Sequence, residues 1–291
     1  MSSQPPSKQK SISNVEKVHG FRGSVLYYLK KNSNPRVLLK LMQVSKYFCF
    51  KEFPYMVVDS LDYDHINENI KLLRYDDVLY NDKYESLVKP LWITKTLNLY
   101  DPNDSKLASK CLSKIAVCDV KNLSLENQIL DVGELKFYAN CGSLESFVFR
   151  DSNVKYGNGT VVPIEEILKL LPKLKSFYWD LHREMASTFT SETTKTIIDF
   201  FDPSLLEFFC LMNIPEPFDF KLFAGFMDAH PSIQFYLFFA RPLSAEYTKM
   251  LQDYVDDLIE TELYKVRKIL IIFPTQTDES FDILLNHFYG Q

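Results

Sequence analysis

A short pattern, in which every second residue is apolar, recurs along most of this chain. In each copy, apolar side chains occupy the first and third positions of a triplet, a pattern that predicts a strand with one buried face. Seven copies follow one another at intervals of 24 to 34 residues, at 97–99, 123–125, 147–149, 177–179, 208–210, 235–237 and 269–271. A unit that returns at this spacing predicts a repeat architecture, in which neighbouring units bury a continuous core.

Helical patterns separate these predicted strands. In the segment 163–171, for example, Ile164, Ile167 and Leu168 fall on one stripe after Pro163, which suits the start of a helix. We expect helices at 105–112, 132–139, 163–171, 193–201, 218–229, 243–263 and 278–288. A strand, a helix and a parallel neighbouring strand form a right-handed crossover. Repeated without reversal, this unit coils into a solenoid with parallel strands inside and helices outside.

This geometry resembles that of leucine-rich repeats. The short form L-x-x-L-x-L-x-x-[NC] is partly kept, because an Asp or Asn follows the second apolar position at Asp101, Asn127 and Asp151. Such a side chain can bond the backbone where a strand turns, although ordinary turn composition would place the same residues there. We therefore predict an α/β fold in which residues 93–291 form a leucine-rich-repeat-like solenoid.

The chain before residue 93 has a different pattern. Residues 1–17 are polar, contain two adjacent prolines and predict a disordered tail. Residues 18–58 contain two apolar helical patterns, separated by a loop that ends at Pro35, and predict a small helical module. In residues 59–92 the apolar residues follow no clean period. We expect either a helical linker or an irregular first repeat there.

The two helical patterns carry a resemblance to a known module. Residues 24–29 read SVLYYL and residues 36–48 read RVLLKLMQVSKYF, which together resemble an F-box. An F-box followed by leucine-rich repeats is a pairing of the kind expanded in nematodes. The resemblance implies that exposed apolar residues of the helices, with Val25, Leu29 and Met42 as candidates, bind the adaptor subunit of a ubiquitin ligase. A second interpretation is that these helices cap the first repeat, since solenoids need capped ends.

Composition narrows the classes of partner. The 291-residue chain has a formal net charge of −5 with both signs dispersed, which predicts no general affinity for nucleic acid or anionic membranes. It contains no 18-residue apolar run and no apolar leader segment at its start. The five cysteines form no C-x-x-C pair and predict reduced, buried thiols. A cytoplasmic or nuclear protein is therefore expected.

The candidate chemistry is sparse. No glycine-rich phosphate loop and no nucleophile elbow occurs, and the five histidines lack metal-ligand spacing. Acidic residues at Asp256, Asp257 and Glu260 predict a solvated helical face rather than a metal site. We therefore predict no catalytic residues, no cofactor and no metal.

The face of the sheet opposite the core leucines is the predicted partner site. In the middle units the alternation gives that face Tyr100, Glu126, Arg150, Tyr178 and Asp180. Aromatic residues and Arg are the commonest anchors of protein interfaces. In the last units the same face would be apolar, and we expect those strands to be covered on both sides, with the residues Phe209, Leu211, Tyr236, Phe238, Leu270 and Ile272.

These observations predict an interaction protein rather than an enzyme. The resemblance implies a substrate-receptor subunit of a cullin–RING ubiquitin ligase, whose repeats select the target protein while the N-terminal helices dock the adaptor. A free-standing repeat scaffold is the alternative among binding proteins. A hydrolase or transferase on a doubly wound α/β sheet is the alternative from another class, and it would reverse its strand order at a ligand loop.

Overall fold

The structure is a computed structural model of the full chain. It describes residues 55–290 apart from positions 76, 140–142 and 241, together with nine positions between 25 and 41. The chain divides into two compact units, Met1–Pro54 and Tyr55–Gln291, which are considered separately. Most of the predicted helical module therefore lies outside the described residues.

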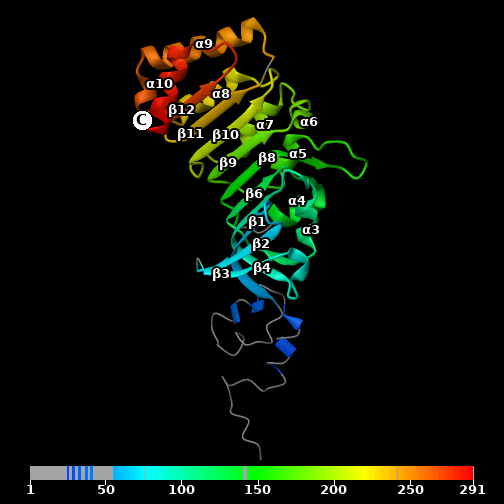
Figure 1. Ribbon diagram of the computed structural model, residues 1–291. Helices are drawn as coiled ribbons and strands as arrows, with labels where there is room; N and C mark the ends of the chain where they lie inside the picture. Colours follow the sequence, from blue (N-terminus) through cyan, green and yellow to red (C-terminus); the bar gives the residue numbers. More distant parts are fainter. Residues whose placement is uncertain are drawn as a thin grey trace, which may run out of the picture. The chain divides into compact units, whose positions relative to one another are not determined.

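The larger unit alternates strands and helices (Figure 1). Its strands are β1 Met56–Asp64, β2 Asn69–Arg74, β3 Asp77–Asp82, β4 Leu91–Tyr100, β5 Ile115–Cys118, β6 Asn122–Glu126, β7 Ile129–Asp131, β8 Ser146–Lys155, β9 Ser176–Leu181, β10 Phe208–Ile214, β11 Gln234–Phe239 and β12 Ile269–Ile272. Its helices are α3 Leu107–Leu112, α4 Val132–Ala139, α5 Ile164–Leu168, α6 Arg183–Ala186, α7 Thr193–Phe200, α8 Phe220–Ala229, α9 Ala245–Glu260 and α10 Asp278–Tyr289, with short 3-10 turns at Tyr84–Ser86 and Leu263–Lys265.

All seven predicted strands are present, and all seven predicted helices occur between or after them. The strands form a mostly parallel, mixed sheet of 12 strands, whose main path runs β12-β11-β10-β9-β8-β6-β4-β1-β2-β3. From β4 to β12 the neighbours on this path are parallel and follow chain order. The predicted α/β class is thus confirmed, and the described strand order contains no reversal between β4 and β12.

Residues 59–92 fold mainly as strands. β1 pairs in parallel with β4 and antiparallel with β2, and β2 pairs antiparallel with β3. The helical linker expected as one alternative is therefore not formed. The boundary at residue 58 is also wrong, because Met56, Val57 and Val58 pair with β4 and belong to the sheet. Two β-branched residues beside a buried strand favour this extended pairing over a helix end.

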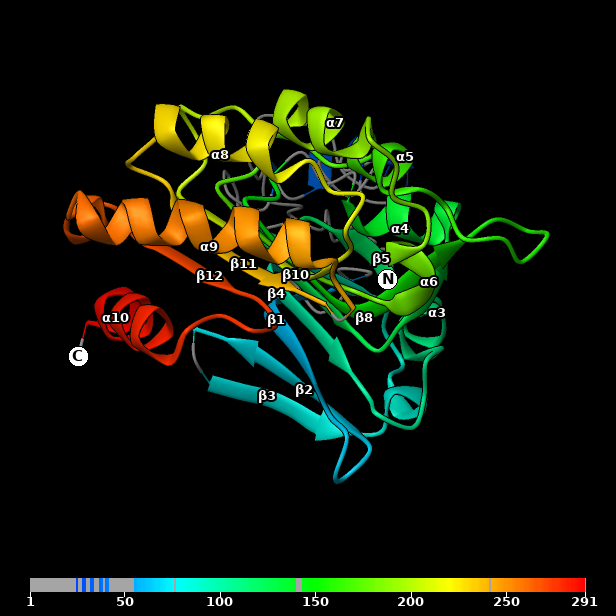
Figure 2. The ribbon, with the colours of Figure 1, turned by 90° about the horizontal axis from the view of Figure 1, so that it is seen from above.

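The core lies between the sheet and the helices. Two rows of side chains cross the strands in register, and each row is almost fully buried. The first row is Leu97, Leu123, Phe147, Phe177, Phe209, Phe235 and Ile269, and the second is Leu99, Leu125, Phe149, Trp179, Leu211, Leu237 and Ile271. Rings of neighbouring strands stack, as in the Phe177–Phe209 pair at 5.4 Å between centroids. Figure 2 shows α5, α7 and α8 on one side of the sheet and α10 on the other.

Asp101 and Asn127, two of the three polar residues expected to bond the backbone after the strands, do so. Asn127, with a positive φ of 53°, donates from Nδ2 to the carbonyl oxygen of Asp101 at 2.7 Å. Asp151 and Asn213 also have positive φ, which Asp and Asn tolerate better than other residues with a Cβ. Asn127 directly follows β6, whereas Asp151 and Asn213 lie within β8 and β10, where the pairing register shifts. All three lie toward the carboxyl ends of the parallel strands, which we call the carboxyl edge of the sheet.

Candidate partner-binding face

The five predicted partner residues lie together on the side of the sheet opposite the core. Tyr100, Glu126, Arg150 and Asp180 form one row across β4, β6, β8 and β9, because each is in register with the next. Tyr178 stands in the adjacent row, opposite Val148 of β8. We call this side, from β4 to β10, the open face. The strand phase that the sequence predicted for these five residues is correct.

Arg150 is at the centre of this group. Its Nη1 lies 3.4 Å from both carboxylate oxygens of Glu126, and its guanidinium carbon lies 4.4 Å from the ring centroid of Tyr178. A guanidinium over an aromatic face gains cation–π attraction, more when the pair is partly desolvated. Its Nε is buried and has no hydrogen-bond partner among the described residues. The side chain is therefore held in place on two sides and retains a donor that is not used.

Asp180 is a half-buried carboxylate beside Arg150. Asn213 Nδ2 donates to its Oδ1 at 2.5 Å, and no cation of the described residues lies within ion-pair distance of it. Burial raises the pKa of Asp180 above its ordinary value, the nearby Asp151 carboxylate raises it further, and the Asn213 bond and Arg150 oppose the shift. A charge kept half-buried without an ion-pair partner is stabilised poorly by the fold itself.

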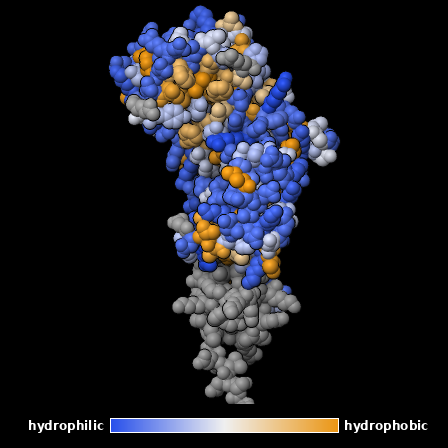
Figure 3. Space-filling view, in the orientation of Figure 1, coloured by the Kyte–Doolittle hydropathy of each residue, from blue (hydrophilic) through white to orange (hydrophobic). Residues whose placement is uncertain are grey.

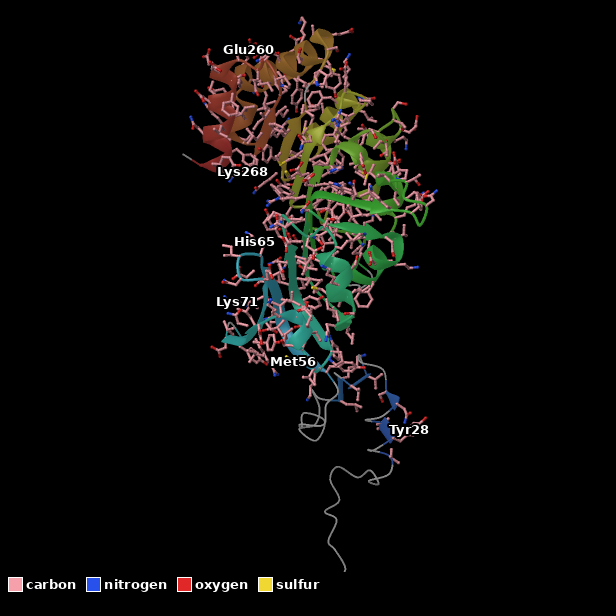
Figure 4. All side chains as sticks on the ribbon, turned by 45° about the vertical axis from the view of Figure 1, so that its right-hand side comes forward. Tyr28, Met56, His65, Lys71, Glu260 and Lys268 are labelled. Carbon is pink, nitrogen blue, oxygen red and sulfur yellow. The ribbon has the colours of Figure 1, made fainter. Side chains whose placement is uncertain are left out.

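Tyr100 marks the other end of the row. Its side chain is 39% exposed, and its ring meets that of His65 edge-on at 5.1 Å between centroids. His65 comes from the turn between β1 and β2, and Lys71 comes from β2; both are labelled in Figure 4, with Met56 at the start of β1. The hairpin therefore borders the open face beside β4.

The phase predicted for β10 is wrong. Phe209 and Leu211 belong to the buried rows, and the side chains on the open face are Phe208, Cys210 and Met212. The run from 208 to 212 is apolar throughout, so its alternation does not fix which side is buried. Pairing fixes it instead, since Phe209 is in register with Phe177 of β9.

The last strands are covered on both sides, as expected. Tyr236 of β11 lies on the open-face side, and its ring is 6.0 Å from that of Phe288 in α10. Leu270 of β12 is buried on the same side, while Phe238 and Ile272 are partly exposed. Apolar side chains gather over β10–β12 in Figure 3, and hydrophilic ones prevail lower on the same side. α10 thus limits the open face at β11.

The predicted adaptor residues are only partly described. Val25 and Leu29 are both helical; Val25 is 41% exposed and Leu29 is half-buried. Met42 lies outside the described residues. In the same unit, Leu38 is buried and Val37 is exposed.

A cavity at the carboxyl edge was not predicted. It has a volume of about 610 Å³ and lies at the ends of β8–β11, against α6 and the loops after β10 and β11. Its lining includes Arg183, Pro215, Glu216, Pro217 and Pro242. The sequence signal for this cavity was the presence of prolines shortly after two successive strands. Only the fold shows that the loops that carry these prolines lie at the same edge of the sheet.

Reactive groups are few in the described part of the chain. Within it, no three His, Cys, Asp or Glu side chains are grouped to hold a metal, and no helix combines the length and apolarity needed to cross a bilayer. Cys111 and Cys210 are buried free thiols, and Cys118 is also buried, as predicted. Burial raises the pKa of Cys111 and of Cys210 to about 12, so neither is a reactive thiolate.

Searches of protein-family models and of curated proteins gave no match for this chain.

Proposed function

We propose that this protein binds a partner protein on the open face, with Arg150 and Tyr178 as anchors. The observation that carries the proposal is the contact group of Glu126, Arg150 and Tyr178 on three successive strands. The ion pair and the ring hold the guanidinium before binding, so little side-chain freedom remains to be lost. Interfaces concentrate their affinity in such aromatic and Arg residues.

The repeat architecture supports this function. Parallel strands in chain order, at intervals of 24 to 34 residues, favour a leucine-rich-repeat-like solenoid over residues 93–291. Each strand then adds one or two side chains to a common surface, which suits a protein partner. A doubly wound enzyme would bind its ligand where the strand order reverses. The described order does not reverse from β4 to β12. It turns back once, at the β1–β4 pair, where β1 continues into the antiparallel strands β2 and β3 without an intervening helix, unlike a doubly wound unit, so binding is favoured over a hydrolase or transferase.

The N-terminal resemblance extends the proposal to a role. An F-box-like module ahead of the repeats would make the chain a substrate receptor of a cullin–RING ubiquitin ligase, with the target on the open face. Val25, Leu29 and Met42 are the proposed adaptor contacts. A free-standing scaffold that binds the same partner without a ligase is the other outcome.

Affinity purification of the full chain tests both parts of the proposal. Arg150→Ala and Tyr178→Ala should lose the target, whereas Tyr156→Ala should keep it, because Tyr156 lies on an exposed turn and bonds Glu166 away from the open face. Deletion of residues 1–54, which leaves β1 intact, should lose the adaptor and cullin but keep the target. Equal recovery of the target by Tyr178→Ala and by the unchanged chain would refute the binding face.

A further inference from the structure

The cavity at the carboxyl edge adjoins the open face through one residue. Asn213 lines the cavity, and its Nδ2 donates to Asp180, the last residue in the row of Tyr100, Glu126 and Arg150. Asp151, which follows Arg150 in β8, also lines the cavity. A chain segment that lies along the open face and passes its carboxyl edge would therefore meet the cavity.

The walls of the cavity are mostly apolar. Leu181 and Phe189 are buried beneath it, and Pro215, Pro217 and Pro242 form sides that carry no backbone N–H donors. A volume of about 610 Å³ falls within the range of about 300–1,000 Å³ that is typical of small-ligand pockets. It can therefore accept a long side chain together with part of its backbone.

Negative charge prevails around the cavity. Among its described lining residues Asp151 and Glu216 are acidic and Arg183 is the one cation, and Asp180 adds a third carboxylate behind Asn213. Glu216 accepts from the backbone N–H of Ser244 at 2.8 Å, and bonding to Ser244 lowers the pKa of Glu216, which keeps it ionised at the cavity. Asp151 is 3.9 Å from His182 Nε2 and largely exposed, which leaves its carboxylate accessible.

We propose that this cavity receives a lysine or arginine side chain of the partner segment that binds the open face. The inference rests on the proposed function and adds a specificity to it. The aliphatic stem of such a side chain lies against the proline and phenylalanine walls while its charged head reaches the carboxylates. A guanidinium is the better fit, because it can donate to two carboxylates in one plane. An anionic side chain would face the carboxylates of Asp151 and Glu216 and one arginine, with Asp180 behind Asn213.

The test uses the full chain and three small probes. These are the Nα-acetyl methylamides of arginine, norleucine and glutamate, followed by methyl NMR of Ala186 and Ala240, which both line the cavity. The arginine probe should shift both methyl signals and saturate at a concentration at least about fivefold lower than the norleucine probe. The glutamate probe should shift neither signal. Equal binding of arginine and norleucine would show an apolar cavity without charge selection and overturn the proposal.

Two variants should change the affinity for the arginine probe in opposite directions. Asp151→Asn removes a carboxylate, keeps a residue type that tolerates the positive φ of 42°, and should weaken binding at least threefold. Arg183→Gln removes the like charge and should strengthen binding about twofold or more. If Arg183→Gln instead abolishes binding while glutamate binds the unchanged chain, the cavity is an anion site and the proposal is wrong. Unchanged amide spectra away from the edge confirm that each variant is folded.

The failure of this inference can be told apart from that of the proposed function. Tyr178→Ala should leave the affinity for the arginine probe unchanged, since Tyr178 does not line the cavity. Suppose that Tyr178→Ala loses the target while Asp151→Asn changes the binding of neither the probe nor the target. This result refutes the proposal for the cavity and leaves the proposal for the open face intact. Suppose instead that the probes bind with charge selection and that Tyr178→Ala recovers the target fully. This result refutes partner binding on the open face and leaves the proposal for the cavity intact.

Discussion

The two sides of the same strands differ in what their side chains contact. On the helix side, the rows that contain Phe149 and Phe177 are buried against other apolar side chains. On the open side, the neighbours of those residues in sequence are Arg150 and Tyr178, which contact each other and solvent. A strand thus separates a stabilising residue from a proposed binding residue by one position. Substitutions at adjacent positions should then separate stability from binding.

A second contrast lies along the open side itself. Over β4–β9 the side chains are largely polar and uncovered, whereas over β11 and β12 they are apolar and α10 packs against them. The covering helix belongs to the same chain, so the apolar end stabilises the fold, and the polar end is the part that we propose to bind a partner. Cys210 on β10 lies at the border and is fully buried despite facing the open side.

The largest effect is expected in the buried rows. Phe149→Ala should lower the free energy of unfolding by about 3–5 kcal/mol, because Phe149 is fully buried between Phe147 and Trp179 and its removal leaves a cavity. Urea unfolding followed by circular dichroism measures the change. The matched control is Val148→Ala, its neighbour on the open side, which should change stability by less than about 1 kcal/mol. Equal losses in the two variants would contradict the assignment of sides.

A smaller loss of stability is expected at the covered end of the open side. Phe288→Ala should lower the free energy of unfolding by about 2–3 kcal/mol, less than a central core position, because Phe288 sits at the rim of the contact with Tyr236 and keeps some exposure. Tyr289→Ala is the control, since Tyr289 is mostly exposed and should be nearly neutral. If both variants melt like the unchanged chain, α10 does not hold the sheet and the open face extends to β12.

Substitutions on the uncovered part of the open face should weaken partner binding and leave stability nearly unchanged. Tyr178→Ala and Arg150→Ala should each weaken partner binding by about 1–2 kcal/mol or more while changing stability by about 0.5 kcal/mol. Titration calorimetry with the purified partner and a thermal melt of the same samples provide both measurements. Should Tyr178→Ala melt as early as Phe149→Ala, the open face would be buried core instead.

The sequence predicted the parts of the fold in which apolar and polar residues alternate. Leu97, Asn98 and Leu99 show which side of a strand is buried, because only one side offers apolar groups. The segment 208–212 carries no such information, and its phase depends on pairing with β9. The strands at 69–74 and 77–82 were missed because a short strand in a hairpin gives a weak pattern. The cavity could not be predicted, since it joins loops whose proximity only the tertiary structure sets.

A small effect on stability is expected for a substitution of Asp180. Unlike the substitutions above, it should stabilise the protein. Burial raises the pKa of this carboxyl above its ordinary value of 3.8, so the folded state disfavours the ionised form that is present at neutral pH. Asp180→Asn keeps an oxygen that accepts from Asn213 and removes the charge. It should therefore raise the melting temperature at pH 7 by about 1–2 °C, because less than about 1 kcal/mol is available at a site that is only half-buried.

The dependence on pH distinguishes this cause from better packing. As the pH falls through the raised pKa toward 3.8, the native carboxyl takes up its proton before the unfolded one does, and the charge penalty disappears. The advantage of Asp180→Asn should therefore shrink over that interval and vanish below it, as melts at several pH values would show. The same variant should bind the partner more weakly, since it removes a carboxylate from the open face. A residue whose removal stabilises the fold and weakens binding is retained for the partner, whereas a loss of stability in Asp180→Asn at pH 7 would assign Asp180 a structural role.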